Sequence, residues 1–400
     1  MLNPSDIAIV SGARTPMGRY GGKLRDFTAM ELGAIAGRAA MERAGVAPAD
    51  FDHVVFGNAQ QTTGDALYGA RHVGLQAGLP IEVPALTVNR LCGSGMQAVV
   101  SSAQMIQLGE ANTVLAGGME AMSQAPHVIR GARWGLGLGE GKMEDSLLVA
   151  LLDTHCGLNM ANTAELYAEQ QQITREMMDE FAVRSQKLAA AAVQGGRLAD
   201  EIIPVPLKNR KGEPSGEFFT ADDHLRPETT LEGLAKLRPA FGKNGSVTAG
   251  NASGIVDGGA AVVVMPFTQA QQRGIRPLGR IVNWGIAGVD PRIMGSGPVP
   301  STRLALKKAG MELPDIDLME VNEAFAGQYL AVEKELGLDR EKVNVNGGAI
   351  ALGHPLGATG TRLLITLLYE LRRRGKKFGL ATACIGGGQG IAVIVESLPA

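Results

Sequence analysis

The 400-residue chain has three cysteines, almost no net charge and no long apolar run. Its formal charge of −2 argues against a general nucleic-acid-binding surface, which requires a large positive excess. No stretch reaches the roughly 18 apolar residues that a membrane-spanning helix needs, so the sequence predicts no membrane contact. Residues 1–16 lack a basic segment followed by an apolar one and are therefore not typical of a secretory signal.

The three cysteines, Cys92, Cys156 and Cys384, show neither a pairing pattern nor the spacing of metal ligands. His155 and Cys156 are adjacent, so they do not form a zinc-binding pattern, and we expect no metal. Unpaired cysteines are typical of a reducing compartment. Since no targeting segment is recognisable, we expect a cytoplasmic location.

Glycine is in excess, with 54 residues, about twice the usual share of roughly 7%. The glycines cluster at the ends of apolar runs, which indicates many tight turns and close backbone approaches. A glycine-rich stretch at 135–143 lacks the spacing of a phosphate-binding loop, and Ser94 lacks the glycines of a hydrolase nucleophile motif.

Short β-rich runs alternate with longer helical patterns, which predicts α/β layers with buried strands. Strands are expected at 8–14, 53–59, 85–91, 113–120, 317–322, 343–346, 378–384 and 391–395, and helices at 29–44, 94–108 and 301–309.

The second part of the chain repeats the pattern of the first, which predicts an internal duplication. Asn58 precedes Cys92 by 34 residues, and Asn322 precedes His354 by 32. In both parts a strand, a polar loop and a helix are followed by a strand that ends in glycines. A chance likeness between generic α/β patterns is the alternative.

Residues 121–249 break this alternation and are predicted to form an inserted loop domain. Asn162 with Glu165 is expected to cap one helix, and Thr174 to cap a second that ends near Gly195. The remaining residues divide into a first half, 1–120 with 250–272, and a second half, 273–400.

Cys92 stands before a Gly-Ser-Gly turn and an apolar run with helical spacing. A helix N-terminus favours negative charge, so this placement predicts a lowered thiol pKa and a reactive thiolate. A small buried residue beside a tight turn is the alternative.

Three further polar residues stand in unusual surroundings. His354 lies on a glycine-rich loop before a helix, where it is either a reactive imidazole or a structural histidine. Cys384 ends an apolar strand, and the GGGQG that follows exposes amides that could bind an oxyanion. Asn322 and Glu323 end a strand, as a polar site or a helix cap.

The chain resembles the thiolase family over essentially its whole length. Four segments match the active-site blocks of that family in order and separation: NRLCGSG with Cys92, VNEAF with Asn322, GHPLGATG with His354 and CIGGGQG with Cys384. The resemblance implies the thiolase fold, in which two duplicated βαβαβαββ halves form stacked αβαβα layers with an inserted loop domain.

The resemblance also implies the chemistry. A thiolase cleaves a 3-oxoacyl-CoA with free CoA, or runs the reverse Claisen condensation. Cys92 would be the nucleophile of a ping-pong mechanism, activated by His354, and Cys384 the acid and base at carbon. His354 with a water held by Asn322 would form one oxyanion hole, and the amides of Cys92 and Gly386 the other.

Acyl-CoA and CoA would be the partners, with coenzyme A a substrate and no bound cofactor. The substrate-binding residues implied are Arg226 beside the adenine, Ser253 on the pantetheine, Met160 in the pantetheine tunnel, and Ala249 and Phe325. The basic residues Lys208, Arg210 and Lys211 are candidate phosphate contacts or a solvated charge run. The family forms dimers or tetramers, and we expect a homotetramer.

Substrate preference is the open point. Asn159 stands where several acetoacetyl-CoA-forming thiolases carry histidine, and Gly233 where some carry serine. Segments 126–160 and 291–300 look more like mitochondrial-type 3-ketoacyl-CoA thiolases, which favours degradation of short to medium chains. A biosynthetic acetoacetyl-CoA thiolase and a non-catalytic acyl-CoA or lipid carrier remain alternatives. A ketoacyl synthase is disfavoured by the second cysteine, Cys384.

Overall fold

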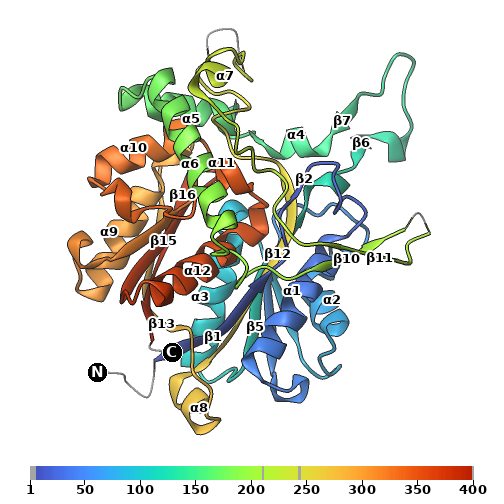
Figure 1. Cartoon of the computed structure of the whole chain (residues 1–400). Helices are drawn as coiled ribbons and strands as arrows, with labels where there is room; N and C mark the ends of the chain where they lie inside the picture. The colour runs from blue at the N-terminus through green and yellow to red at the C-terminus, as the bar shows by residue number, and fades with distance from the viewer. Residues whose placement is uncertain (1–5, 210, 242–244, 399–400) are drawn as a thin grey trace.

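The computed structural model describes residues 6–209, 211–241 and 245–398, and a ten-stranded sheet runs through it (Figure 1). The first half contributes β1 (Ile7–Arg14), β2 (Gly18–Arg19), α1 (Ala29–Ala44), β3 (His53–Gly57), α2 (Gly69–Ala77), β4 (Ala85–Val88), α3 (Ser94–Gln107), β5 (Val114–Ala121) and β12 (Val256–Pro266). The second half contributes β13 (Gly279–Gly288), α9 (Pro298–Ala309), β14 (Leu318–Val321), α10 (Ala326–Leu336), α11 (Ala349–Leu352), α12 (Leu356–Arg373), β15 (Phe378–Ile385) and β16 (Gln389–Ser397), and α8 (Phe267–Gln272) joins the halves.

The strand order confirms the duplication. It runs β4, β3, β5, β12, β1 in one half and β14, β15, β16, β13 in the other. Each half places its last strand antiparallel between its first strand and a parallel pair. The two sheets join where β1 pairs with β13. The strand expected at 343–346 is wrong: only Val343 forms a bridge, to Met319.

Strand register shows which residues occupy equivalent places. Gly57 pairs with Gly118 in the first half, and Val321 pairs with Thr382 in the second. One residue further on, Asn58 therefore corresponds to Asn322. Two residues further on, Glu120 corresponds to Cys384. Cys92 and His354 are likewise equivalent, since each precedes the central helix of its half.

Successive side chains along a strand point to opposite faces of the sheet, and the apolar ones pack into three separate layers. On β12, Val262 and Val264 pack with α3 and α12, whereas Val263 packs with α1 on the opposite face. On β16, Val393 faces the same central helices and Ile394 faces α9 and α10. The order is thus α, β, α, β, α, and the central layer brings the N-termini of α3 and α12 together.

Close approach in this central layer depends on glycine. A Cβ on Gly118 of β5 would lie 1.9 Å from the carbonyl oxygen of Gly357, in the first turn of α12. Any larger residue would push this helix, and the His354 loop before it, away from the sheet.

The loop segment between β5 and β12 carries β6 (His127–Ile129), β7 (Met143–Asp145), α4 (Ser146–Ala150), β8 (Leu152–Asp153), β9 (Leu158–Asn159), α5 (Met160–Gln170), α6 (Arg175–Gln194), β10 (Val205–Lys208), β11 (Pro214–Phe219) and α7 (Leu231–Ala235). Thr174 caps α6 as predicted. The capping pair Asn162–Glu165 is wrong, because α5 begins one turn earlier and its cap is Asn159.

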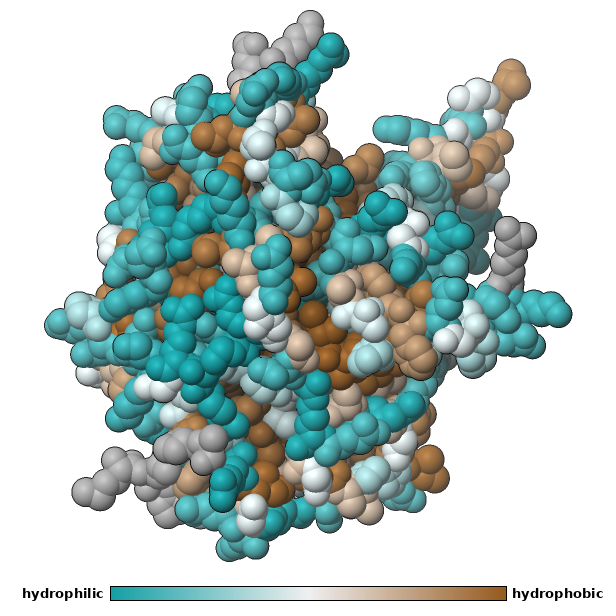
Figure 2. Space-filling model, viewed as in Figure 1, coloured by the Kyte–Doolittle hydropathy of each residue, from teal (hydrophilic) through white to brown (hydrophobic). Residues whose placement is uncertain are grey.

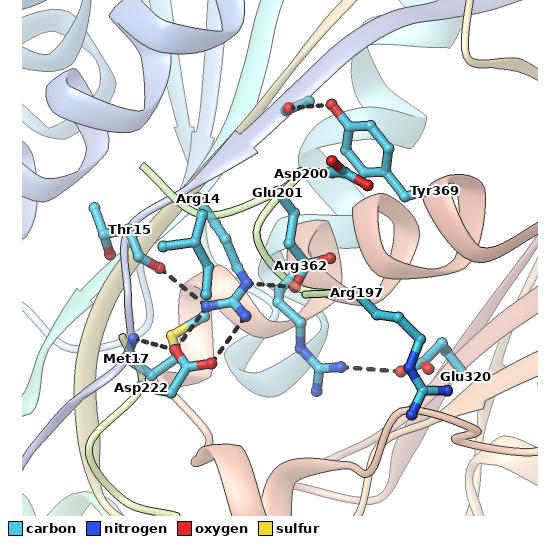
Figure 3. Close-up of polar contacts among 12 residues, drawn as sticks. Arg14, Thr15, Met17, Arg197, Asp200, Glu201, Asp222, Glu320, Arg362 and Tyr369 are labelled. Carbon is cyan, nitrogen blue, oxygen red and sulfur yellow. Dashed lines mark hydrogen bonds and ion pairs between the residues drawn. The ribbon is translucent and has the colours of Figure 1, made fainter. Parts of the chain in front are cut away.

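A buried ionic cluster ties this segment to the first half, and a second buried ion pair lies within the second half (Figure 3). Arg14 of β1 is fully buried and donates to Asp222 at 2.7 and 2.9 Å and to Glu201 at 2.7 Å. Arg362 of α12 pairs with Glu320 of β14 at 2.9 Å. Buried charges require such partners, so the cluster fixes where the loop segment meets the core.

Among the described residues, no helix is both long and apolar enough to cross a membrane.

Candidate active site

One pocket of about 460 Å³ lies where the two halves and the loop segment meet. Nine of the ten site residues predicted from the sequence line it: Cys92, Met160, Arg226, Ala249, Ser253, Phe325, His354, Cys384 and Gly386. The tenth, Asn322, is buried beside His354. The structure therefore gathers residues that are up to 294 positions apart in the sequence.

Cys92 lies in a 3₁₀ turn that leads directly into α3. The turn is strained at Leu91, which has a φ of 45° although it is not glycine. Side chains compensate: Asn89 accepts from the Leu91 N–H at 2.9 Å, and the Ser94 hydroxyl donates to the Leu91 carbonyl at 2.7 Å. This strained turn presents the Cys92 sulfur to the pocket.

The position of Cys92 before a helix predicted a lowered thiol pKa, but the pKa is raised instead. Burial raises its pKa to about 11. The backbone N–H groups of Gly386 and of Cys92 itself face the sulfur and lower the pKa, while the charge of Glu120 raises it further. Desolvation outweighs the helix terminus, so the resting enzyme holds a thiol rather than a thiolate.

His354 is buried, and burial together with the positive charge of Arg362 lowers its pKa to about 3. Its Nδ1 lies 2.6 Å from the Thr359 hydroxyl, which donates to the Pro355 carbonyl at 3.0 Å. Since that hydroxyl proton is committed, Nδ1 must donate, which leaves Nε2 as an acceptor. A neutral imidazole with a free Nε2 lone pair is a general base.

Asn322 approaches the same nitrogen, with its amide Nδ2 at 3.3 Å from His354 Nε2, while its Oδ1 has no hydrogen-bond partner among the described residues. Its backbone N–H donates to the Thr382 carbonyl at 2.9 Å, which fixes the residue at the end of β14. The Asn322 amide and the His354 imidazole thus lie side by side, and together they form what we call the polar corner.

Glu323 lies outside the pocket and holds the His354 loop. Its carboxylate accepts from the Ser185 hydroxyl at 2.6 Å, from Asn344 at 2.8 Å and from the Ile350 N–H at 3.2 Å. Burial raises its pKa. These bonds fix the position of the loop.

Cys384 ends β15 as a fully buried side chain, and burial raises its pKa well above the usual range for a thiol. It is therefore a protonated acid at neutral pH. Gly386, two residues on, turns its amide toward the Cys92 sulfur. A Cβ at Gly386 would lie 3.1 Å from both Leu91 and Met160, so glycine keeps this approach open.

Sequence reasoning missed Glu120 and Thr359. Glu120 is buried and accepts from Asn58 at 2.9 Å, from the N–H groups of Ala59 at 3.1 Å and Gln60 at 2.9 Å, and from the Gly357 N–H at 2.7 Å. It thus joins the first half to the first turn of α12, and burial raises its pKa to about 7. The duplication could have found it, because it occupies the place equivalent to Cys384.

The pocket mouth also contains residues without a sequence signal: Arg19, Tyr20 and His224. Asn159 lines the pocket as the α5 cap, whereas Gly233 lies in α7 and donates to Thr230. Lys208 does not line this pocket; its ammonium pairs with Glu31 and lies over the Phe27 ring. Arg210 lies outside the described residues.

No group of three or more His, Cys, Asp or Glu side chains in the described part of the chain is arranged to hold a metal ion.

Comparison with known proteins defines the class. A model of the thiolase N-terminal domain matches residues 7–268, and a model of the thiolase C-terminal domain matches residues 275–397. The chain belongs to the thiolase family, an acyltransferase family, and the predicted thiolase fold is confirmed.

Individual relatives are similar over their full length. The human mitochondrial 3-ketoacyl-CoA thiolase is 53% identical over 98% of both chains. The acetyl-CoA acetyltransferase of Cupriavidus necator is 50% identical over 98% of this chain and 99% of its own. A crystal structure of the human enzyme in complex with CoA superposes with a TM-score of 0.95 at 52% identity, covering 98% of each chain.

Proposed function

We propose that this enzyme cleaves 3-oxoacyl-CoA with free CoA to give acetyl-CoA and a shortened acyl-CoA, through an acyl-Cys92 intermediate. One observation carries the proposal. A thiol, a neutral imidazole and a protonated second thiol line one pocket, and two backbone amides converge on the first sulfur. Family relatives named for both cleavage and acetyl transfer support a reversible reaction.

In the first half-reaction the Cys92 sulfur attacks the 3-oxo carbon while its proton passes to His354 Nε2. The oxyanion that forms is stabilised by the N–H groups of Cys92 and Gly386. Collapse breaks the bond between C2 and C3, and the electron pair moves into the enolate of the departing acetyl thioester. Cys384 donates its proton to C2, and acetyl-CoA leaves.

The enolate oxygen also carries negative charge before that proton arrives. The polar corner at Asn322 and His354 is suited to it, because the Asn322 amide and the imidazolium formed in the attack can both donate. In the second half-reaction free CoA gives its thiol proton to the Cys384 thiolate and attacks the acyl group. Cys92 leaves and recovers its proton from His354, so both thiols return to their starting state.

The substrate would enter past the mouth of the pocket. Arg226 also lines the pocket and would contact the anionic nucleotide end, while Met160, Ala249, Ser253 and Phe325 would accept the pantetheine arm. The deeper wall contains apolar side chains, including Met122, Met294 and Leu356, which suit an acyl chain. We propose a short- to medium-chain preference.

Two alternatives remain distinct. A biosynthetic enzyme would use the same residues to condense two acetyl-CoA molecules, with Cys384 as the base at C2. A carrier without catalysis would not need a neutral His354 fixed through Thr359. CoA-dependent cleavage of four-, eight- and sixteen-carbon 3-oxoacyl-CoA, compared by kcat/KM, tests the proposal. Absence of cleavage with all three would overturn it.

We also propose a homotetramer. β4 ends the sheet, and no other described strand pairs with its outer edge, next to which Leu67, Tyr68 and Leu86 are exposed. This edge suits a twofold contact with a second copy. Leu86→Asp should then reduce the tetramer to dimers in sedimentation, and an unchanged assembly would refute this interface.

A second contact would come from the protruding hairpin of β6 and β7 (Figure 1). Trp134 and Leu138 are almost fully exposed on it, and apolar side chains gather at its tip in Figure 2. Such a patch is typical of an association surface. Joint substitution of both residues by Ser should leave dimers. The proposed cytoplasmic location rests on the sequence alone, and cell fractionation tests it.

A further inference from the structure

The proposed oxyanion hole is assembled from the two halves of the chain. One donor is the N–H of Cys92, on the turn before α3, and the other is the N–H of Gly386, just after β15. Almost 300 residues separate them, so only non-covalent contacts fix the distance between the two N–H groups. A donor displaced by about 1 Å can cost roughly a hundredfold in rate.

Apolar contacts hold the two loops against each other. A Cβ on Gly93 would lie 2.5 Å from Ile385 Cδ1, and one on Gly386 would lie 3.1 Å from Leu91 Cδ1. Such packing sets how closely the loops approach. It is non-directional, however, and gives little resistance to sliding along the surface.

Arg90 supplies a directional contact between the same loops. Its Nη1 donates to the Gln389 Oε1 of the second half at 2.9 Å, and its Nε donates to Gln97 Oε1 of α3 at 2.8 Å. A planar guanidinium with two donors engaged cannot rotate freely, so it fixes direction as well as distance.

Both ends of this link are rigid. Gln389 begins β16 and is paired with Ile385 on one side and Gly288 on the other. Arg90 is held within the nucleophile turn, because its N–H donates to the Ser94 hydroxyl at 2.9 Å and its carbonyl accepts from the Gly93 N–H at 2.9 Å. The hydrogen bond between the Arg90 and Gln389 side chains therefore fixes the Cys92 turn relative to the strands of the second half.

We propose that Arg90, through Gln389, is a positioning residue that sets the spacing of the two oxyanion-hole amides. The inference rests on the proposed function, since it assigns a role in the acyl transfer to Cys92. Both acceptors of Arg90 are neutral amides, so its contribution is geometric rather than that of an ion pair. Loss of Arg90 therefore changes no charge beside the sulfur, and it affects the thiol only through a displaced Gly386 N–H, which lowers the pKa of Cys92.

Two reactions of Cys92 separate these effects. Acyl transfer from acetyl-CoA passes through an oxyanion, whereas alkylation by iodoacetamide displaces iodide and forms none. Arg90→Met and Gln389→Leu should each slow acylation of Cys92 about 10- to 100-fold, measured by rapid quench and mass spectrometry. Alkylation forms no oxyanion, so it should fall by no more than about threefold, through the displaced Gly386 N–H that lowers the Cys92 pKa.

The double variant and two further substitutions sharpen the test. Arg90→Met with Gln389→Leu should be no slower than either single variant, since both remove the same bond. Gln389→Glu keeps an acceptor and should restore most of the rate. Arg43→Met is a matched control, because Arg43 also donates to neutral acceptors, the backbone carbonyl oxygens of Gly12 and Asp200, and does not line the pocket. It should acylate like wild type.

Unchanged acylation in both single variants, or equal loss of acylation and alkylation, would overturn the inference. The two single variants remove the bond from opposite sides, so a folding defect in one leaves the other to decide. The activity of the wild-type enzyme distinguishes failure of the proposed function from failure of this inference. If the wild type cleaves no 3-oxoacyl-CoA, the proposed function is refuted. If it does, and both variants acylate Cys92 as fast as wild type, only the role of Arg90 is refuted.

Discussion

The protonation state of Cys92 in the resting enzyme can be measured directly. Burial raises its pKa to about 11, and burial with the charge of Arg362 lowers that of His354 to about 3. The two groups are therefore expected to rest as a neutral thiol and a neutral imidazole at every pH between these values. Many cysteine nucleophiles instead rest as a thiolate–imidazolium pair.

The magnitude follows from the pKa. At pH 7 a thiol of pKa about 11 is ionised to a fraction of about 10⁻⁴, against a few per cent for an ordinary cysteine. Forming the free thiolate at that pH would cost about 5 kcal/mol. Loss of the thiol proton to His354 must then accompany attack on the substrate carbonyl rather than precede it.

The assay is a pH titration of the ultraviolet absorbance of the thiolate, taken as the difference between wild type and Cys92→Ser. The expected difference is flat from pH 5 to about 9 and rises only as the pH approaches about 11. A full thiolate signal already present at neutral pH would refute the argument, because it would show that the ion pair is the resting state despite burial.

Four other predictions follow from the site and its support. Cys384→Ala should still take an acetyl group onto Cys92, seen as a mass increase, but should lose carbon–carbon cleavage at least about a hundredfold; equal loss of both steps would contradict the division of roles. Thr359→Val removes the acceptor of His354 Nδ1 and should lower kcat about tenfold, with the rate restored in Thr359→Ser. Arg14→Met leaves two buried carboxylates unpaired and should lower the free energy of unfolding by about 3–5 kcal/mol in denaturant titrations. Because the pKa of buried His354 is depressed, its contribution to stability should be complete above its usual pKa of about 6.5 and should fall as the pH drops toward 3, so that urea titrations of His354→Asn show a weaker acid dependence than wild type.

The parts of the site that the sequence predicted are those with strong local signals. Glycine-flanked polar residues at strand ends and helix starts placed Cys92, His354 and Cys384, and the duplicated spacing indicated that their loops would meet. The helix expected at 29–44 has these bounds in the structure, where a Thr28–Glu31 capping box and Gly45 stand at its two ends.

The rest depends on tertiary structure. Asn159 rather than Asn162 caps α5, because either residue can cap a helix and only packing chooses the starting turn. The hydrogen bond from His354 to Thr359 and the link from Arg90 to Gln389 have no sequence pattern. The raised pKa of Cys92 has no sequence pattern either, since it reflects burial by segments that are distant in the chain.

The equivalence of Cys92 with His354, and of Glu120 with Cys384, bears on how such a site could arise. In a symmetric dimer of two identical half-length chains, equivalent positions necessarily carry the same residue. A cysteine in one copy would then require a cysteine at the equivalent position of the other, so the places of Cys92 and His354 could not differ. Joining the halves in one chain removes that constraint, because each position can change alone. The duplication that the strand order preserves thus permits a functional asymmetry in the pocket that two identical halves could not have.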